Sequence, residues 1–421
     1  MTHLVYFYLC IFNYLDYFLI LILGGEEGVA GAMFHPGVLF RGLLTVLLFY
    51  DYVVRKKLNK RITLFVSLFL ISVLFLLPLH NYMRFSAAIA ISEIYFSVKI
   101  AFFILLAHYI SKHHRYFIQR LPVIMHCNVI IVTLNLYLSY FFHFGRTTMY
   151  TDMSFYKGYL GGNAQSVFLF TFFCYYLYNY NKGRTYIIFF LLNLFNFYIL
   201  GTKAFYFIGI ITPLFILYRM KLKGTKTFLA LFIFASIMLT LHFSTNLTSS
   251  LKSLYQQRLG YHLIREQEKL QLKGKMYKDN EALSKMEDIT SGPRLYRAVT
   301  NLSFFIKSDL ASKVVGQGKA GQNKAILMAA KMDIIDVLVN YGLLGAVALY
   351  VVILWVVCKS MILRSFDFIT VAVFSIFLYS SLGGFVIGSA GAASVFALFL
   401  GIKMADIFSP HSSCAKRNAS S

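Results

Sequence analysis

Long apolar segments recur along nearly the whole chain, and they restrict its fold more than any other feature. A helix that crosses a bilayer needs about twenty consecutive, mostly apolar residues. Segments of about that length follow one another here, separated by short polar turns and one long polar stretch. They predict an all-α, polytopic membrane protein with about 12 transmembrane helices and one large, partly helical external loop. The segments cover residues 3–24, 37–54, 62–80, 86–110, 122–143, 163–180, 185–200, 202–218, 227–243, 334–357, 367–386 and 390–408.

The composition agrees with a membrane protein and disfavours other classes. Of the 421 residues, 58% are hydrophobic and only 14% are charged, which is more apolar than a soluble fold requires. The five cysteines show no Cys-x-x-Cys spacing, and none lies in the long polar stretch. We therefore predict neither a disulfide framework nor a zinc site. No cationic region precedes the first apolar run, so we do not interpret it as a cleavable signal.

A formal net charge of +23 could indicate a nucleic-acid partner, but the placement of the charges favours a membrane topology. Of the 40 Lys and Arg residues, 18 form short clusters in alternate turns between apolar segments and in the tail. Cytoplasmic loops carry such an excess, so both termini are predicted to be cytoplasmic and no nucleic-acid partner is expected. The basic clusters are 53–61, 111–120, 181–184, 218–226, 358–364 and 415–417.

The same alternation places the long polar stretch outside the membrane and divides the chain into three parts. Residues 1–243 hold predicted helices 1–9, residues 244–331 form the external loop, and residues 332–421 hold helices 10–12 with a short cytoplasmic tail. The loop is basic, which suggests an anionic partner on the outer face. Leucines at helical spacing predict two or more amphipathic helices in the loop, and Pro293 is typical of a helix start.

Five ionisable residues in or beside apolar segments need an explanation, because charge at membrane depth is costly. Asp16, Arg41, Glu93 and Lys99 fall inside the segments. They either form internal ion pairs, for instance Arg41 with Glu93, or contribute to a substrate cavity. Lys203 falls near the outer end of two closely joined segments. It either extends its amine to the interface or binds the phosphate of an outer-leaflet headgroup.

Two carboxylates precede the tenth apolar segment. Asp333 and Asp336 are three residues apart, which puts both side chains on one face of a helix, one turn above the apolar stretch. Acids near a helix amino terminus are favoured by capping and by the helix dipole, worth about 0.3–1 kcal/mol. The alternative is a functional role at the membrane surface, and the residues alone leave both open.

Several short motifs on the predicted outer face occur in a distinctive order. They are "KGYLGGNAQSVF" (157–168), "GTKAFY" (201–206), "SGPRLYR" (291–297), "VVGQGKAG" (314–321), "KMDIIDVLVNYGLLG" (331–345) and "SSLGGFVIGSAGA" (380–392). Over roughly residues 155–400, this order resembles the O-antigen polymerase and O-antigen ligase superfamily of bacterial membrane glycosyltransferases. The first 150 residues resemble that superfamily only in being hydrophobic.

Four features carry the resemblance. They are a Gly-x-x-x-x-Asn entry to a helix, a cation after the next helix, a Ser-Gly-Arg-like turn, and a Gly-x-Gly followed by an acid before a Tyr-Gly helix. Pro293 intrudes into the turn, so Arg297 is an alternative to Arg294. Asp336 stands where ligases carry His, which favours a polymerase. The residues are Gly158 and Asn163, then Lys203, then Ser291, Gly292, Arg294 and Tyr296, and lastly Gly316, Gly318, Asp336, Asn340, Tyr341 and Gly342.

The resemblance implies transfer of a glycan from a polyprenyl diphosphate on the outer face of a bacterial inner membrane, without metal or cofactor. In that interpretation Asp336 accepts the proton of the attacking hydroxyl, and Asp333 positions the sugar or a neighbouring cation. The expected cations for the diphosphate are Arg294, Arg297 and Lys203, and Asn163 is a further substrate-binding residue. Arg294 could instead pair with an acid at 287–288. The implied partners are undecaprenyl-diphosphate-linked oligosaccharide, the lipid bilayer and a chain-length regulator protein.

Three functions remain in competition at this stage. A polymerase extends one lipid-linked repeat unit with another, whereas a ligase transfers the finished glycan to a lipid A core or a protein. A flippase for lipid-linked sugars would also be polytopic and basic inside. The single large loop on one side disfavours the flippase, because transport by alternating access tends towards near-symmetric halves.

Overall fold

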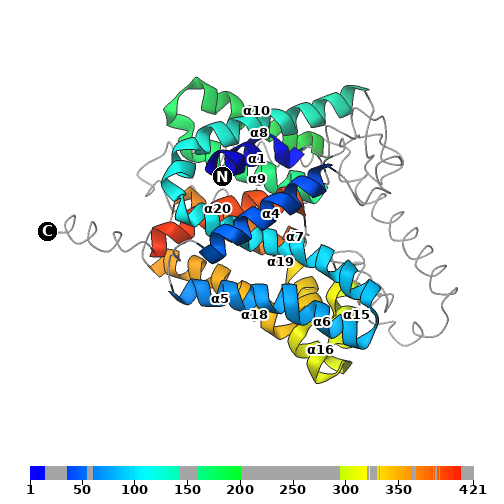
Figure 1. The fold of residues 1–421 in the computed structure, drawn as a ribbon. Helices are drawn as coiled ribbons and strands as arrows, with labels where there is room; N and C mark the ends of the chain where they lie inside the picture. Colours follow the sequence, from blue (N-terminus) through cyan, green and yellow to red (C-terminus); the bar gives the residue numbers. More distant parts are fainter. Residues whose placement is uncertain are drawn as a thin grey trace.

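The structure is a computed structural model, and every regular element in its described residues is a helix. It describes residues 1–14, 36–54, 60–142, 160, 162–200, 294–319, 322, 330, 332–362, 367–382, 384, 386–387 and 389–408. The predicted all-α class is confirmed for this part of the chain (Figure 1). The α-helices are α1 (Thr2–Cys10), α4 (Pro36–Val54), α5 (Lys60–Ile71), α6 (Leu77–Arg84), α7 (Ala87–Lys112), α8 (His114–Phe142), α9 (Gly162–Asn179), α10 (Arg184–Leu200), α15 (Arg294–Lys307), α16 (Leu310–Val315), α18 (Asp333–Ile362), α19 (Phe368–Leu382) and α20 (Ala390–Phe408).

Within the described ranges, five helical stretches are long and apolar enough to cross a membrane. A sixth, Phe368–Ser381, is apolar but shorter. A helical membrane protein is thus supported, while the number of about 12 spans stays a prediction. The predicted segments 202–218 and 227–243 and the first amphipathic loop helix lie outside the described residues. The five stretches are Ile62–Arg84, Ala87–Lys112, His114–Phe142, Asp333–Ser360 and Gly391–Phe408.

Three predicted boundaries differ from the structure. The segment 3–24 begins as α1 but this helix ends at Cys10, and a 3₁₀ turn follows. The segment 122–143 lies within α8, which already begins at His114 in the basic turn. Hydropathy marks the membrane boundary, whereas a helix continues through Lys and Arg without difficulty. The segment 367–386 ends earlier, because α19 stops at Leu382 before a glycine-rich connection.

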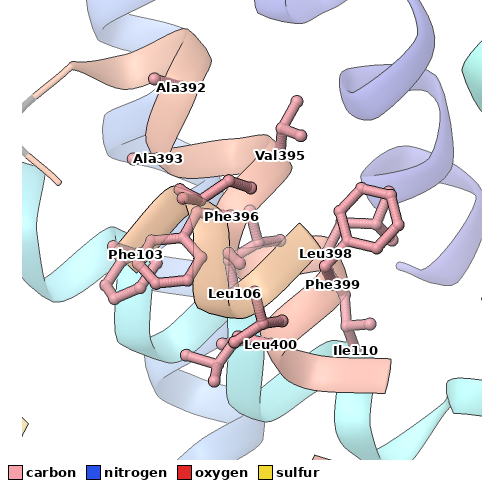
Figure 2. Close-up of a cluster of buried hydrophobic side chains, with 14 of the residues drawn as sticks. Phe103, Leu106, Ile110, Ala392, Ala393, Val395, Phe396, Leu398, Phe399 and Leu400 are labelled. Carbon is pink, nitrogen blue, oxygen red and sulfur yellow. The ribbon is translucent and has the colours of Figure 1, made fainter. Parts of the chain in front are cut away.

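The core is built around α7 and α20, which lie side by side and run in the same direction. The rings of Phe103 and Phe396 are 5.3 Å apart, and further along both helices Gly401 faces Ala107 (Figure 2). A side chain at Gly401 would meet the Ala107 carbonyl, so glycine permits this close approach. Residues 100–111 of α7 are all buried. A helix that is apolar all round belongs in the interior of such a bundle.

The helix ends that adjoin the basic turns gather at one end of the bundle. Lys112 at the end of α7 forms an ion pair of 2.7 Å with Asp51 near the end of α4. Lys403 near the end of α20 pairs at 3.1 Å with Asp367, which precedes α19. We call this region, defined by these four residues, the basic end. Alternating helices of a membrane protein must meet in this way if their basic turns share one side.

The opposite end carries the carboxyl-terminal part of the predicted loop. Arg84 at the end of α6 donates to Asp309 at 3.1 Å and also to Ser312, which joins α16 to the α6–α7 hairpin. Asp333 at the start of α18 lies at this same end. We call the region defined by these residues the loop end. Figure 1 shows α6, α15 and α16 together there, at the lower right.

A helix, α15, occupies the part of the chain where the second amphipathic helix of the loop was predicted, although Val299 and Ile306 of the predicted apolar face are exposed. It begins at Arg294, directly after Pro293, as the helix-start signal indicated. Ala298, Asn301 and Phe305 are buried at spacings of three and four residues, and α15 contacts α18. This spacing puts the buried side chains on one face.

Candidate functional site

Two glycine motifs of the predicted outer face are in direct contact. Gly342 has a non-helical backbone (φ 64°, ψ −174°), which interrupts α18 within its apolar stretch. A break there deprives nearby carbonyls of their intrahelical partners. The Val339 carbonyl instead accepts the N–H of Gln317 at 3.1 Å. The Gly-x-Gly turn is thereby docked on the Asn-Tyr-Gly segment of α18.

Glycine is required on both sides of this contact. Gly316 (φ 97°) and Gly342 (φ 64°) both adopt the left-handed region that side chains disfavour. A Cβ on Gly316 would overlap the Asn340 carbonyl, and a Cβ on Gly342 would overlap the Val314 carbonyl. The resemblance named these glycines from their spacing, and the geometry gives the physical reason for them.

The other glycine of the turn brings in the amino-terminal half of the chain. Gly318 (φ 70°) packs directly against the carboxylate of Glu93 on α7 and the amide of Asn81 on α6. Both side chains are 0% exposed. Glu93 therefore joins the loop end of the bundle, across more than two hundred residues of sequence. Its predicted ion pair with Arg41 stays a prediction.

Asp333 holds the connection between α19 and α20 rather than the first turn of its own helix. Its Oδ2 accepts the backbone N–H groups of Val386 and Ile387, each at 2.9 Å, and the side chain is 1% exposed. A buried acceptor oxygen needs such donors, because burial without a hydrogen bond costs about 1–3 kcal/mol. Asp333 thus fixes Val386 and Ile387 beside the start of α18.

Asp336 lies one turn further along α18 and is also buried. Its Oδ1 accepts the N–H of Ala330 at 2.8 Å, which orients the carboxyl group towards the chain that enters the helix. Capping of the helix's own amides was the alternative for both acids. The recorded partners of Asp333 and Asp336 lie outside the first turn of α18, so these carboxylates organise the loop end instead.

Lys319 follows the Gly-x-Gly turn and is surrounded by charged groups. Burial lowers the pKa of its ammonium group. Attraction by Asp336 and Glu93 opposes that shift, whereas repulsion by Lys99 adds to it. The ammonium nitrogen also lies 5.5 Å from the ring centroid of Phe96. A cation and several carboxylates therefore share one partly buried region.

Several buried amides belong to the same turn, to its neighbours in sequence, and to α6 and α18. In the part of the chain that the structure describes, no hydrogen-bond partner is recorded for either amide atom of Asn81, for the Nε2 atoms of Gln317 and Gln322, or for Asn340 Oδ1. A buried polar atom without a partner costs about 1–3 kcal/mol. Such atoms are suited to a ligand rich in hydroxyl groups, because each can donate or accept on contact.

The predicted site residues are distributed as follows. Asp333 and Asp336 lie together at the loop end, and Arg297 is partly buried on α15, which contacts α18. Asn163 falls in the first turn of α9 and Arg294 is the first residue of α15, but the side chains of both lie outside the described residues. The position predicted for Lys203 lies wholly outside them.

Sequence reasoning did not single out Lys319, Asn81 or Gln317 as site residues. The signal for Lys319 and Gln317 was present, because both belong to the Gly-x-Gly turn that the resemblance named. Asn81 had no signal, since a single amide between two apolar segments is typical of an ordinary turn.

Comparison with known proteins identifies no family for this chain. No family model matches the chain, and neither the curated proteins nor the solved structures include a match.

Proposed function

We propose that the chain is a membrane glycosyltransferase, namely a polymerase that extends one lipid-linked repeat unit with another on the outer face. The observation that carries this proposal is the meeting of Asp336, Glu93 and Lys319 beside the docked glycine motifs. An ionisable residue within a membrane-spanning helix, such as Glu93 in α7, is by default a candidate for a functional site. The order of the outer-face motifs supplies the reaction class.

The reaction needs no redox partner. A hydroxyl oxygen of the acceptor sugar forms a bond to the anomeric carbon of the donor, and the bond from that carbon to the diphosphate breaks. The electron pair leaves with the polyprenyl diphosphate. The hydroxyl proton passes to the Asp336 carboxylate and is later released. Such general-base assistance is worth roughly 100- to 10,000-fold in rate.

The second contribution comes from cations near the leaving group. The departing diphosphate gains negative charge, and a preorganised donor in a partly dry site supplies about 3–4 kcal/mol. Arg294, Arg297 and Lys203 are the candidates from the motif order. Lys319 is a further candidate, because Asp336 lies close enough to attract its ammonium group.

The sidedness of the bundle is compatible with this chemistry. The candidate site lies at the loop end, opposite the end where the basic turns gather. The positive-inside rule assigns basic turns to the cytoplasm, so the loop end faces outwards in this proposal. A lipid-linked donor with its tail in the outer leaflet would present its diphosphate there.

A deletion strain complemented with variants tests the function. We expect loss of the chain to leave a single repeat unit on the lipid A core, and Asp336→Asn to reproduce that pattern at normal protein level. Polymer stranded on the carrier lipid would indicate a ligase instead. Repeat units that never reach the outer face would indicate a flippase. Either of those patterns would remove the polymerase assignment.

A further inference from the structure

Two lysines from distant parts of the chain converge on one aromatic ring. The ammonium nitrogen of Lys99 on α7 lies 5.6 Å from the ring centroid of Phe96, and that of Lys319 lies 5.5 Å from the same centroid. The two nitrogens are therefore separated by no more than the sum of those distances. The charge of Lys99 disfavours a charge on Lys319, and an anion near both lysines would offset this effect.

Lys99 belongs to an exposed and otherwise apolar stripe on the surface of α7. Ile91, Tyr95 and Lys99 are spaced four residues apart and share one face of α7. Ile91 is 67% exposed and Tyr95 37% exposed, and Lys99 is also exposed. This is the surface that a membrane helix presents to lipid, and a lysine there is costly unless it meets a charged group.

The side chain of Lys99 also points towards the loop end. Its nitrogen lies 4.2 Å from the ring centroid of Tyr95, which precedes it by one turn. Counted from Lys112 at the basic end, about twenty residues of α7 cross the hydrocarbon and reach Glu93 at the opposite boundary. Lys99 begins about 9 Å below Glu93 and its stem extends back towards that boundary.

We propose that Lys99 and Lys319 together bind the diphosphate of a lipid carrier that reaches them sideways from the bilayer, past the exposed stripe of α7. This inference rests on the proposed function for the identity of the lipid. Lys99 meets the headgroup first, at the lipid-facing surface. Lys319 then holds it beside Asp336 and Glu93. A diphosphate carries enough negative charge to neutralise both ammonium groups at once.

The surroundings of the lysines carry charges of both signs. The groups that face Lys319 are Asp336 on α18 and Glu93 and Lys99 on α7. Burial and repulsion by Lys99 lower the pKa of the Lys319 ammonium group, and an anion bound near both lysines would oppose this shift. The two acids keep Lys319 directed towards the position where a sugar on the diphosphate would meet Asp336.

Binding of the lipid, without any sugar, tests the proposal. The purified full-length chain in nanodiscs of neutral phosphatidylcholine is exposed to radiolabelled polyprenyl diphosphate. We expect Lys99→Gln and Lys319→Gln each to weaken binding at least about tenfold, as loss of a charge-assisted contact does. Lys307→Gln, which removes an exposed lysine at the same end, should change binding less than about twofold.

Competitors identify the source of the anion. Polyprenyl monophosphate should compete weakly, and free pyrophosphate should compete far less than the lipid form, because the approach is through the bilayer. Equal competition by free pyrophosphate would overturn the lateral approach. Equal competition by phosphatidylglycerol would overturn the assignment to a diphosphate. Wild-type binding by both lysine variants, or equal loss in Lys307→Gln, would overturn the lysine pair itself.

The two proposals fail in different ways. Lipid binding that depends on both lysines, in a chain that forms no polymer, would overturn the polymerase and leave the binding site intact. If the wild type forms polymer but Lys99→Gln binds the lipid normally, the binding site would be overturned and the polymerase would stand. Lys99 is exposed, so this variant stays informative if Lys319→Gln fails to fold, and Lys319→Arg serves as a charge-preserving second variant.

Discussion

Buried charged groups have different kinds of partners at the two ends of the bundle. At the basic end, acids meet cations in close pairs, as Asp51 and Lys112 do at 2.7 Å. At the loop end, Asp333 and Asp336 accept backbone N–H groups, and Glu93 joins them beside Lys319. Close pairs satisfy both partners and hold helices together. The loop end instead concentrates acids around a turn, which is an arrangement suited to a ligand.

Helix α7 carries this contrast along its own length. Its carboxyl half, residues 100–111, is entirely buried and packs on α20 (Figure 2). Its amino half holds Glu93 and Ser97 on the inner side and an exposed stripe on the other. One helix therefore supplies both the rigid core and part of the candidate site. Sites on such rigid elements keep their geometry better than sites on loops.

The largest effect is expected when an ion pair at the basic end is broken. Asp51→Asn leaves Lys112, whose side chain is 10% exposed, without its counter-charge in the bundle. Removal of one partner from a buried pair costs about 3–5 kcal/mol. We expect a much lower melting temperature in detergent and less protein in the membrane. The activity of each folded molecule should be unchanged, and a selective loss of activity at normal stability would contradict the contrast between the ends.

Asp333→Asn should act at the loop end with a smaller effect on stability. The substitution replaces a carboxyl group whose oxygen accepts the backbone N–H groups of Val386 and Ile387, and it introduces a buried amide donor. Each buried hydrogen bond contributes about 0.5–1.5 kcal/mol, so a net loss of about 2 kcal/mol is expected. Polymer formation should fall about tenfold. Thermal unfolding and glycan gels measure the two effects, and an unchanged glycan pattern would make Asp333 purely structural.

Gly318→Ala probes the contact between the turn and α7. The added methyl group would overlap Glu93 and Asn81, and the backbone at φ 70° would be strained. A cost of about 1–3 kcal/mol is expected, with loss of activity. Gly42→Ala on α4 is the matched control, because a Cβ there meets nothing within 4 Å. The control should be neutral or slightly stabilising; equal effects of both variants would argue against a specific contact.

The smallest effect is expected at the exposed link between α6 and α16. Arg84→Gln removes the ion pair with Asp309, whose two side chains are 37% and 52% exposed. Exposed pairs are worth less than about 1 kcal/mol. Hydrogen bonds from Ser312 lower the pKa of Asp309 below its ordinary 3.8. The stabilisation by the Arg84–Asp309 pair is therefore present at neutral pH and is lost only as the pH falls below about 3.8. Acid unfolding of the wild type and of Arg84→Gln can measure this loss.

Hydropathy predicted most of the described helices, because apolar length is a local property. Segment 37–54 became α4 and segment 86–110 became α7 with small shifts. The break of α18 at Gly342 was not predicted, since the glycine sits in an otherwise continuous apolar pattern. Only its contact with Gly316 explains the left-handed backbone.

The candidate site was predictable only in part, because contacts between distant segments are not a local property of the sequence. Asp333 and Asp336 were visible in the sequence because two acids three residues apart stand at the start of an apolar segment. The approach of Glu93 and Asn81 to Gly318 depends on packing between segments more than two hundred residues apart. No local pattern encodes such a contact. Glu93 was recognised as costly at membrane depth, but its neighbours required the structure.

The most direct test is glycan transfer by the purified chain from a lipid-linked repeat unit, with Asp336→Asn and Asp336→Glu compared at equal folded amounts. The account predicts polymer from the wild type, a loss of about 100-fold or more in Asp336→Asn, and substantially higher activity in Asp336→Glu. Equal activity of the two variants would contradict it, because Asp336 would then serve only to hold Ala330.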